Sequence, residues 1–81
     1  MTSHSSSIWS EELQQQTRDA IEQLRVTADG RLYFKHATLG YAYATYDDLC
    51  NNRLVLYSDR GGDTHHFPWI NNLLQAGWVL D

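Results

Sequence analysis

The Asp29-Gly30 pair is the sequence feature that most constrains how this chain folds. It separates two short runs in which apolar and polar residues alternate, a pattern typical of a β-hairpin. A three-residue loop over 28–30, with the glycine in the left-handed conformation, pairs Val26 with Leu32 on an apolar face. A two-residue loop would instead pair Val26 with Tyr33 and give a mixed face. We therefore predict the three-residue loop.

The opposite face of this predicted hairpin collects basic and aromatic side chains. Tyr and Arg are enriched at protein interfaces, and Arg interleaved with aromatic residues on a sheet can also stack bases and hold phosphates. An ordinary solvated sheet face with Arg–Tyr packing is the alternative without a binding function. The predicted binding residues are Arg25, Arg31, Tyr33 and Lys35, extended by Tyr41 and Tyr43 of the next run.

A helix is predicted over 11–23, before the hairpin. Apolar and small residues recur there at positions that line one side of a helix, from Leu13 onward. Ser10 is a suitable N-cap, and Glu11 and Glu12 place negative charge at the positive end of the helix dipole.

The run 41–45 alternates large and small residues and predicts a strand, with a helix as the alternative reading. Thr45 and Asp48 have the spacing of a capping box, which indicates a short helix through Cys50. We expect Cys50 to be a small buried residue, because cysteine is among the residue types most often buried.

The last third of the chain predicts a second hairpin and a closing helix. Strands are expected at 54–57 and 64–67, joined by a loop over 58–63. Pro68 suits the first turn of the helix, and Gly77 suits the position that ends it. A short edge strand at 79–80 completes the pattern.

These elements predict the α+β class: a small antiparallel sheet of about four to five strands, with the two main helices packed on one face. Residues 1–9 are expected to be a flexible Ser-rich tail and residues 10–81 a single small domain. A chain of 81 residues needs large side chains to build a core. We assign that role to four aromatic residues, with Trp9 beside them: Phe34, Phe67, Trp69 and Trp78.

Composition narrows the class of protein. The chain contains no apolar run of 18 residues, which argues against a membrane span, and its one cysteine cannot form an internal disulfide. The N-terminal residues lack the charged and apolar regions of a signal peptide, so we expect a cytoplasmic protein. The net charge of −4 disfavours a dedicated polyanion binder.

Residues that could carry chemistry do not converge in the sequence. Asp63, His65 and His66, with His36 from elsewhere, come nearest to a metal site. Neighbouring residues of a strand point to opposite faces, however, so the two adjacent histidines cannot readily share one ion. We expect one to be half-buried and the other exposed, and we predict no metal or cofactor.

A non-enzymatic protein-interaction module, acting on a protein partner through the Arg/Tyr face or an exposed strand edge, is the function that the sequence favours. The alternative is binding of single-stranded nucleic acid by the same face, which the net charge opposes. A metal- or thiol-dependent enzyme using Asp63, His65 and Cys50 is the third hypothesis.

Overall fold

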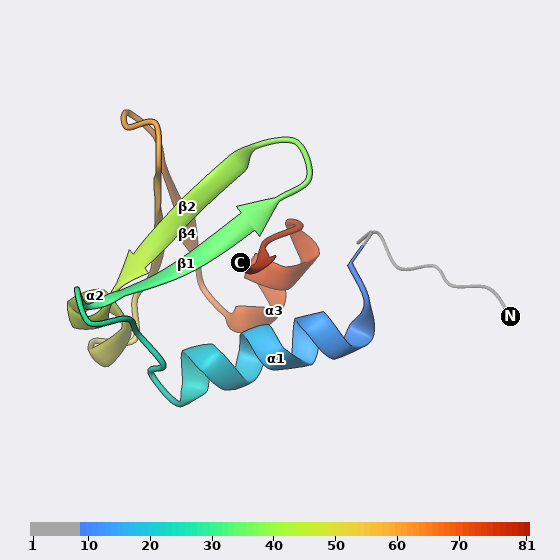
Figure 1. Cartoon of the computed structure of the whole chain (residues 1–81), viewed down its shortest axis with the longest axis horizontal. Helices are drawn as coiled ribbons and strands as arrows, with labels where there is room; N and C mark the ends of the chain where they lie inside the picture. Colours follow the sequence, from blue (N-terminus) through green and yellow to red (C-terminus); the bar gives the residue numbers. More distant parts are fainter. Residues whose placement is uncertain (1–8) are drawn as a thin grey trace, which may run out of the picture.

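The computed structural model describes residues 9–81 and contains a five-stranded antiparallel sheet with three helices (Figure 1). The α+β prediction is confirmed. The strand order is β4-β3-β2-β1-β5, so the last strand lies beside the first. In chain order the elements are α1 (Glu11–Glu22), β1 (Arg31–His36), β2 (Gly40–Thr45), α2 (Tyr46–Cys50), β3 (Leu54–Ser58), β4 (Thr64–Phe67), α3 (Ile70–Gln75) and β5 (Val79–Leu80).

Helix α1 begins as predicted and protects one edge of the sheet. The Ser10 side chain accepts a hydrogen bond from the Leu13 backbone N–H at 3.1 Å. Further along, the fully buried Thr17 hydroxyl accepts the Leu80 backbone N–H at 2.8 Å. An exposed edge strand offers unpaired backbone groups to other chains, and α1 covers that edge at β5.

The segment between α1 and β1 forms the predicted three-residue turn. The Thr27 N–H donates to the Arg31 carbonyl at 2.8 Å, and the Gly30 N–H donates to the Thr27 carbonyl at 2.9 Å. Gly30 has a φ of 78°, the left-handed conformation expected at the end of such a turn.

The hairpin register predicted around this turn is wrong. Val26 belongs to no strand, and β1 pairs with β2 on one side and with β5 on the other. Six residue pairs join β1 to β2 on one edge, and on the other edge β5 pairs with Phe34 and Lys35, where the predicted register would have placed Leu24. Leu24 and Val26 instead pack against the core.

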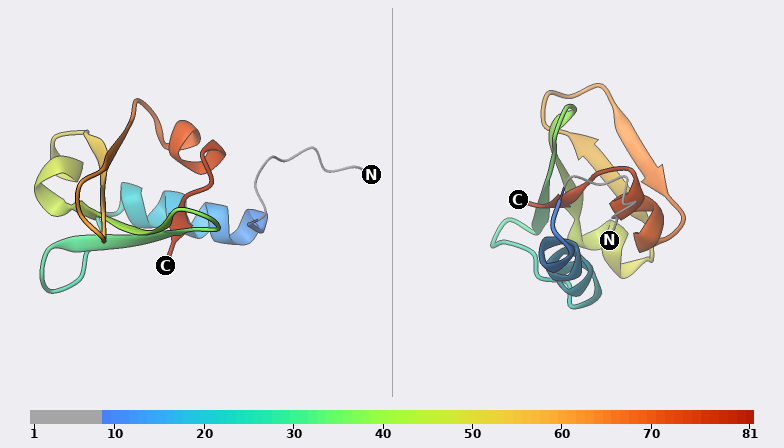
Figure 2. Two further views of the ribbon diagram at one scale, coloured as in Figure 1. Left: turned by 90° about the horizontal axis from the view of Figure 1, so that it is seen from above. Right: turned by 90° about the vertical axis from the view of Figure 1, so that its right-hand side faces the viewer.

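The β1–β2 hairpin has one buried and one outward side. Alternate residues of the two strands, Leu32, Phe34, Ala42 and Ala44, are buried in the core, and the residues between them point the other way. Figure 2 (left) shows the hairpin nearly edge-on, with α3 on one side of it and no helix on the other. We call this uncovered side the outer face. Residues 41–45 are a strand, as predicted, and not a helix.

The two later helices follow their predicted end signals. The Thr45 hydroxyl accepts the Asp48 N–H at the start of α2. Gly77, with a φ of 101°, ends α3: its N–H donates to the Leu74 carbonyl and the Trp78 N–H donates to the Leu73 carbonyl. These two bonds are the Schellman arrangement.

Two burial predictions are wrong. Cys50 is exposed because it lies at the last position of the short helix α2, where Leu49 takes the buried side. Trp69 is 72% exposed because α3 begins only at Ile70, so Pro68, expected in the first turn, and Trp69 both lie before the helix, with Trp69 in an extended conformation.

The core combines residues of α1 and α3 with the buried sides of β1, β2 and β3. Phe34 and Trp78 are buried as predicted, and Phe67 and Trp9 pack partly buried against the same cluster. The Trp9 indole donates to the Gly77 carbonyl at 2.8 Å. Residues 1–8 of the expected tail lie outside the described residues.

Within residues 9–81, no helix has the length and apolar character that crossing a membrane requires.

Candidate functional site

Three tyrosines from neighbouring strands form a row on the outer face. Tyr33 of β1 pairs with Tyr43 of β2, which in turn pairs with Tyr57 of β3. The ring centroids of Tyr33 and Tyr43 are 6.3 Å apart, and those of Tyr43 and Tyr57 are 5.5 Å apart and stacked. Both separations lie in the range of favourable aromatic pairs. We call these three residues the tyrosine row.

Arg31 adds a cation to the row. Its guanidinium carbon lies 4.3 Å from the centroid of the Tyr43 ring, within cation–π distance. The Tyr43 ring is therefore contacted by Arg31 of β1 and by Tyr57 of β3, the two strands that flank it. The Tyr43 hydroxyl makes no hydrogen bond within the described chain, so its polar end is available to a partner.

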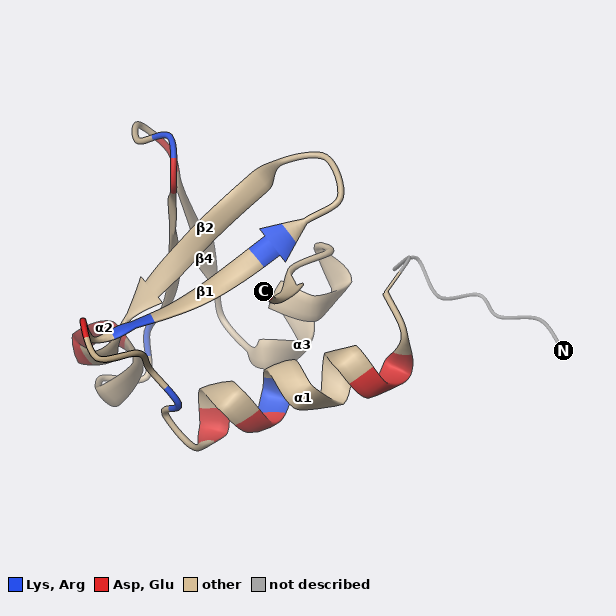
Figure 3. Cartoon of the chain, viewed as in Figure 1, with Lys and Arg blue, Asp and Glu red and all other residues tan. Residues whose placement is uncertain are grey.

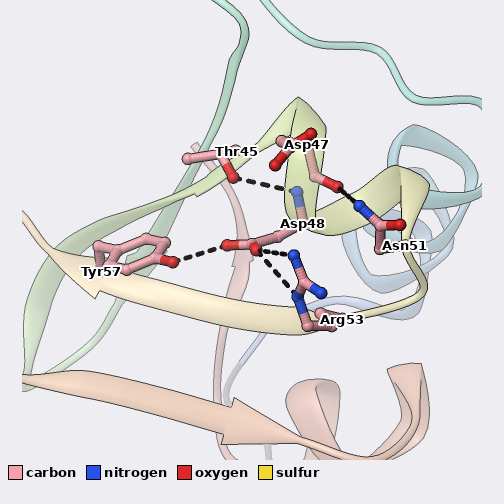
Figure 4. A network of polar contacts seen from close by, with 6 residues as sticks. All are labelled: Thr45, Asp47, Asp48, Asn51, Arg53 and Tyr57. Carbon is pink, nitrogen blue, oxygen red and sulfur yellow. Dashed lines mark hydrogen bonds and ion pairs between the residues drawn. The ribbon is translucent and has the colours of Figure 1, made fainter.

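Asp48 fixes the β3 end of the tyrosine row (Figure 4). Its carboxylate accepts the Tyr57 hydroxyl at 2.7 Å and forms an ion pair with Arg53 at 3.0 Å. Only 8% of Asp48 is exposed, and all its buried side-chain oxygens have partners. The bond from Tyr57, followed by the Arg53 interaction, lowers the pKa of Asp48, while the same bond raises the pKa of Tyr57.

Asp29 fixes the β1 end of the row from the turn before β1. Its carboxylate accepts the Tyr33 hydroxyl at 2.8 Å and also the hydroxyl of Thr27. Both bonds lower the pKa of Asp29, and the bond from Thr27 has the larger effect. Both outer tyrosines of the row are thus held by carboxylates at opposite ends, and the rings are ordered before any partner binds.

The structure brings together three of the six predicted binding residues: Arg31, Tyr33 and Tyr43. Lys35 and Tyr41 pair with each other further along the same strands, and the Lys35 ammonium lies 5.2 Å from the Trp9 ring centroid. Arg25 does not join them, because it lies outside the sheet and its guanidinium donates to the Gln23 side chain.

Sequence reasoning missed Tyr57, Asp48, Arg53 and Asp29 as members of this site. Tyr57 enters through the register of β3 on β2, which no local pattern specifies. A signal for Asp48 was present in its capping-box spacing from Thr45, because the short helix that Thr45 caps lies between β2 and β3.

A hollow of about 400 Å³ adjoins the row beyond Tyr57, between α2 and the edge strand β4. Polar groups of Asp48, Arg53, Thr64 and His66 and apolar groups such as Val55 and Phe67 line it. A larger groove of about 680 Å³ shares Arg53 and Pro68 with it and extends toward Trp69 at the start of α3.

The residues considered for metal or thiol chemistry lie apart. The His36 and His65 rings contact Trp78 with centroid separations of 4.9 and 5.4 Å. His65 is half-buried and His66 exposed, as predicted. No group of three or more His, Cys, Asp or Glu side chains suited to a metal occurs in residues 9–81.

Comparison of the chain with protein-family models, with curated proteins and with solved structures found no match.

Proposed function

We propose that this chain is a non-enzymatic protein-binding module whose contact surface is the outer face around the tyrosine row. The observation that carries the proposal is the tyrosine row, held at both ends by carboxylates and contacted by Arg31, on a sheet side that no helix covers (Figure 2). The few residues that dominate binding energy at protein interfaces are enriched in Trp, Tyr and Arg, and side chains held in place beforehand lose less entropy on binding.

The geometry favours a protein over single-stranded nucleic acid. Binding of bases uses the open face of an aromatic ring as a stacking surface. The Tyr43 ring already has Arg31 and Tyr57 against it, so a base would have to displace one of them. A protein partner can instead contact the ring edges and the free Tyr43 hydroxyl without rearranging the row.

The experiment that tests the proposal is photo-cross-linking in the native cells, with a benzophenone amino acid at Tyr41. This residue is 57% exposed and lies on the outer face two positions from Tyr43. We expect a discrete cross-linked protein. Tyr43→Ala should weaken binding of the purified partner at least about 30-fold, the effect of losing a central hot-spot residue.

Tyr46→Ala is the control, because it also removes a tyrosine ring that solvent reaches, at 48% exposure, but one that belongs to α2 and not to the tyrosine row. It should leave the affinity unchanged. Absence of a discrete cross-link, or equal effects of Tyr43→Ala and Tyr46→Ala, would refute the proposal. Quenching of tyrosine fluorescence by an oligonucleotide at low salt, lost as salt rises, would favour the nucleic-acid alternative.

A further inference from the structure

The β1–β2 hairpin is basic in an acidic protein. Residues 31–45 contain Arg31 and Lys35 and no Asp or Glu, so they carry a formal charge of +2, while the rest of the chain carries −6. Figure 3 shows this separation: both ends of β1 are blue, and neither β1 nor β2 has any red.

Neither cation of this hairpin is neutralised by an ion pair within residues 9–81, although each contacts an aromatic ring. The one ion pair of the described residues joins Arg53 to Asp48, so neither Arg31 nor Lys35 has a carboxylate partner. The Asp29 carboxylate lies close to Arg31, but it accepts the hydroxyls of Thr27 and Tyr33. Asp81 lies beside β1 through its backbone N–H to the Tyr33 carbonyl and forms no ion pair with either cation.

The spacing of the two cations suits an extended segment. Arg31 and Lys35 are four residues apart on the same side of one strand, a separation of about 13 Å between their positions in the backbone. Carboxylates four residues apart on an extended partner have the same spacing. Between the cations, Tyr33 and its partner Tyr43 offer aromatic edges for apolar contact, and Tyr41 lies opposite Lys35.

From this charge complementarity we infer that the outer face binds an acidic, extended segment of a protein partner, with two carboxylates facing Arg31 and Lys35 and an apolar or aromatic residue against the tyrosine row. The inference rests on the proposed function and adds the chemistry of the partner. Complementary charge also speeds encounter between partners and excludes basic competitors.

The test is a nuclear magnetic resonance titration of the full chain with synthetic peptides. The probe is an extended dodecapeptide with two Glu residues four positions apart and a Val midway, compared with the same peptide carrying Gln for Glu. We expect amide shifts confined to 31–35 and 41–45 with the Glu peptide and none with the Gln peptide. The shifts should shrink as salt is raised.

Charge variants locate the contact. Arg31→Gln and Lys35→Gln should each weaken binding of the Glu peptide about two- to fivefold, the effect of losing one exposed ion pair. Arg60→Gln is the matched control, because Arg60 is an exposed arginine of the loop between β3 and β4. It should leave the affinity unchanged.

Equal binding of the Glu and Gln peptides, or equal effects of all three variants, would overturn the inference. The inference would also be overturned, in favour of nucleic acid, if the chain bound oligothymidylate but not the Glu peptide and Arg31→Gln abolished the binding of oligothymidylate. If neither probe binds but the cross-linked partner still depends on Tyr43, the acidic partner is refuted and the proposed function stands.

Discussion

Replacement of Asp48 by Ala tests the network that orders the tyrosine row. The substitution removes the acceptor of the Tyr57 hydroxyl and the partner of Arg53. A hydrogen bond to a charged group contributes about 1.5–3 kcal/mol. The Arg53 side chain is 54% exposed, so its ion pair adds at most a fraction of a kcal/mol. We therefore expect a loss of about 2 kcal/mol in the free energy of unfolding, or about 8–16 °C in Tm.

Asp47→Ala is the matched control. Asp47 also lies in the first turn of α2, so its removal has a similar effect on the helix dipole, but its carboxylate makes no hydrogen bond (Figure 4). Urea unfolding followed by tyrosine and tryptophan fluorescence gives the two free energies. Losses at pH 7 that agree within about 0.5 kcal/mol would show that the network does not stabilise the fold.

The pH dependence provides a second measurement on the same variants. The pKa of Asp48 is lower in the folded chain, so its stabilisation is complete above the ordinary aspartate value of about 3.9 and is lost as the pH falls through the lowered value. The difference between wild type and Asp48→Ala should therefore shrink as the pH falls below about 4. A difference that stays constant below that pH contradicts the assignment.

Two further predictions concern the closure of the fold. Gly77→Ala should destabilise the chain more than Gly61→Ala by at least about 1 kcal/mol in urea unfolding. Both glycines have positive φ, but only at Gly77 would the new Cβ meet another side chain, at 2.7 Å from Nε2 of His36. Thr17→Val should cost about 1–3 kcal/mol and speed hydrogen exchange at the Leu80 amide, which loses its acceptor, whereas Thr17→Ser should preserve both.

Local signals in the sequence predicted the ends of the elements. The caps at Ser10, Thr45 and Gly77 each use groups within five residues along the chain, so their chemistry is visible as a short pattern. The partner of β1 could not be read in the same way. The segment before the turn, β2 and β5 could each pair with β1, which has only two edges. The alternation of apolar residues does not show which two of these segments will pair with it.

The candidate site was predictable where it follows the alternation along one strand. Arg31 and Tyr33 share a face because they are two residues apart, whatever strand pairs with them. Tyr57 joins the row only through the pairing of β2 with β3. Trp69 became exposed because α3 starts at Ile70, which leaves Trp69 in extended backbone before the helix and not on its apolar face.

The first helix and the last strand depend on each other, which has a consequence for how this domain folds. The bonds from Trp9 to Gly77 and from Leu80 to Thr17 span 68 and 63 residues. Closing such long loops is slow compared with forming a local turn. The β-meander from β1 to β4 can assemble from neighbouring segments, but β1 keeps an open edge until residues 78–80 dock. Removal of those residues should therefore leave an incomplete, association-prone intermediate rather than a smaller stable domain.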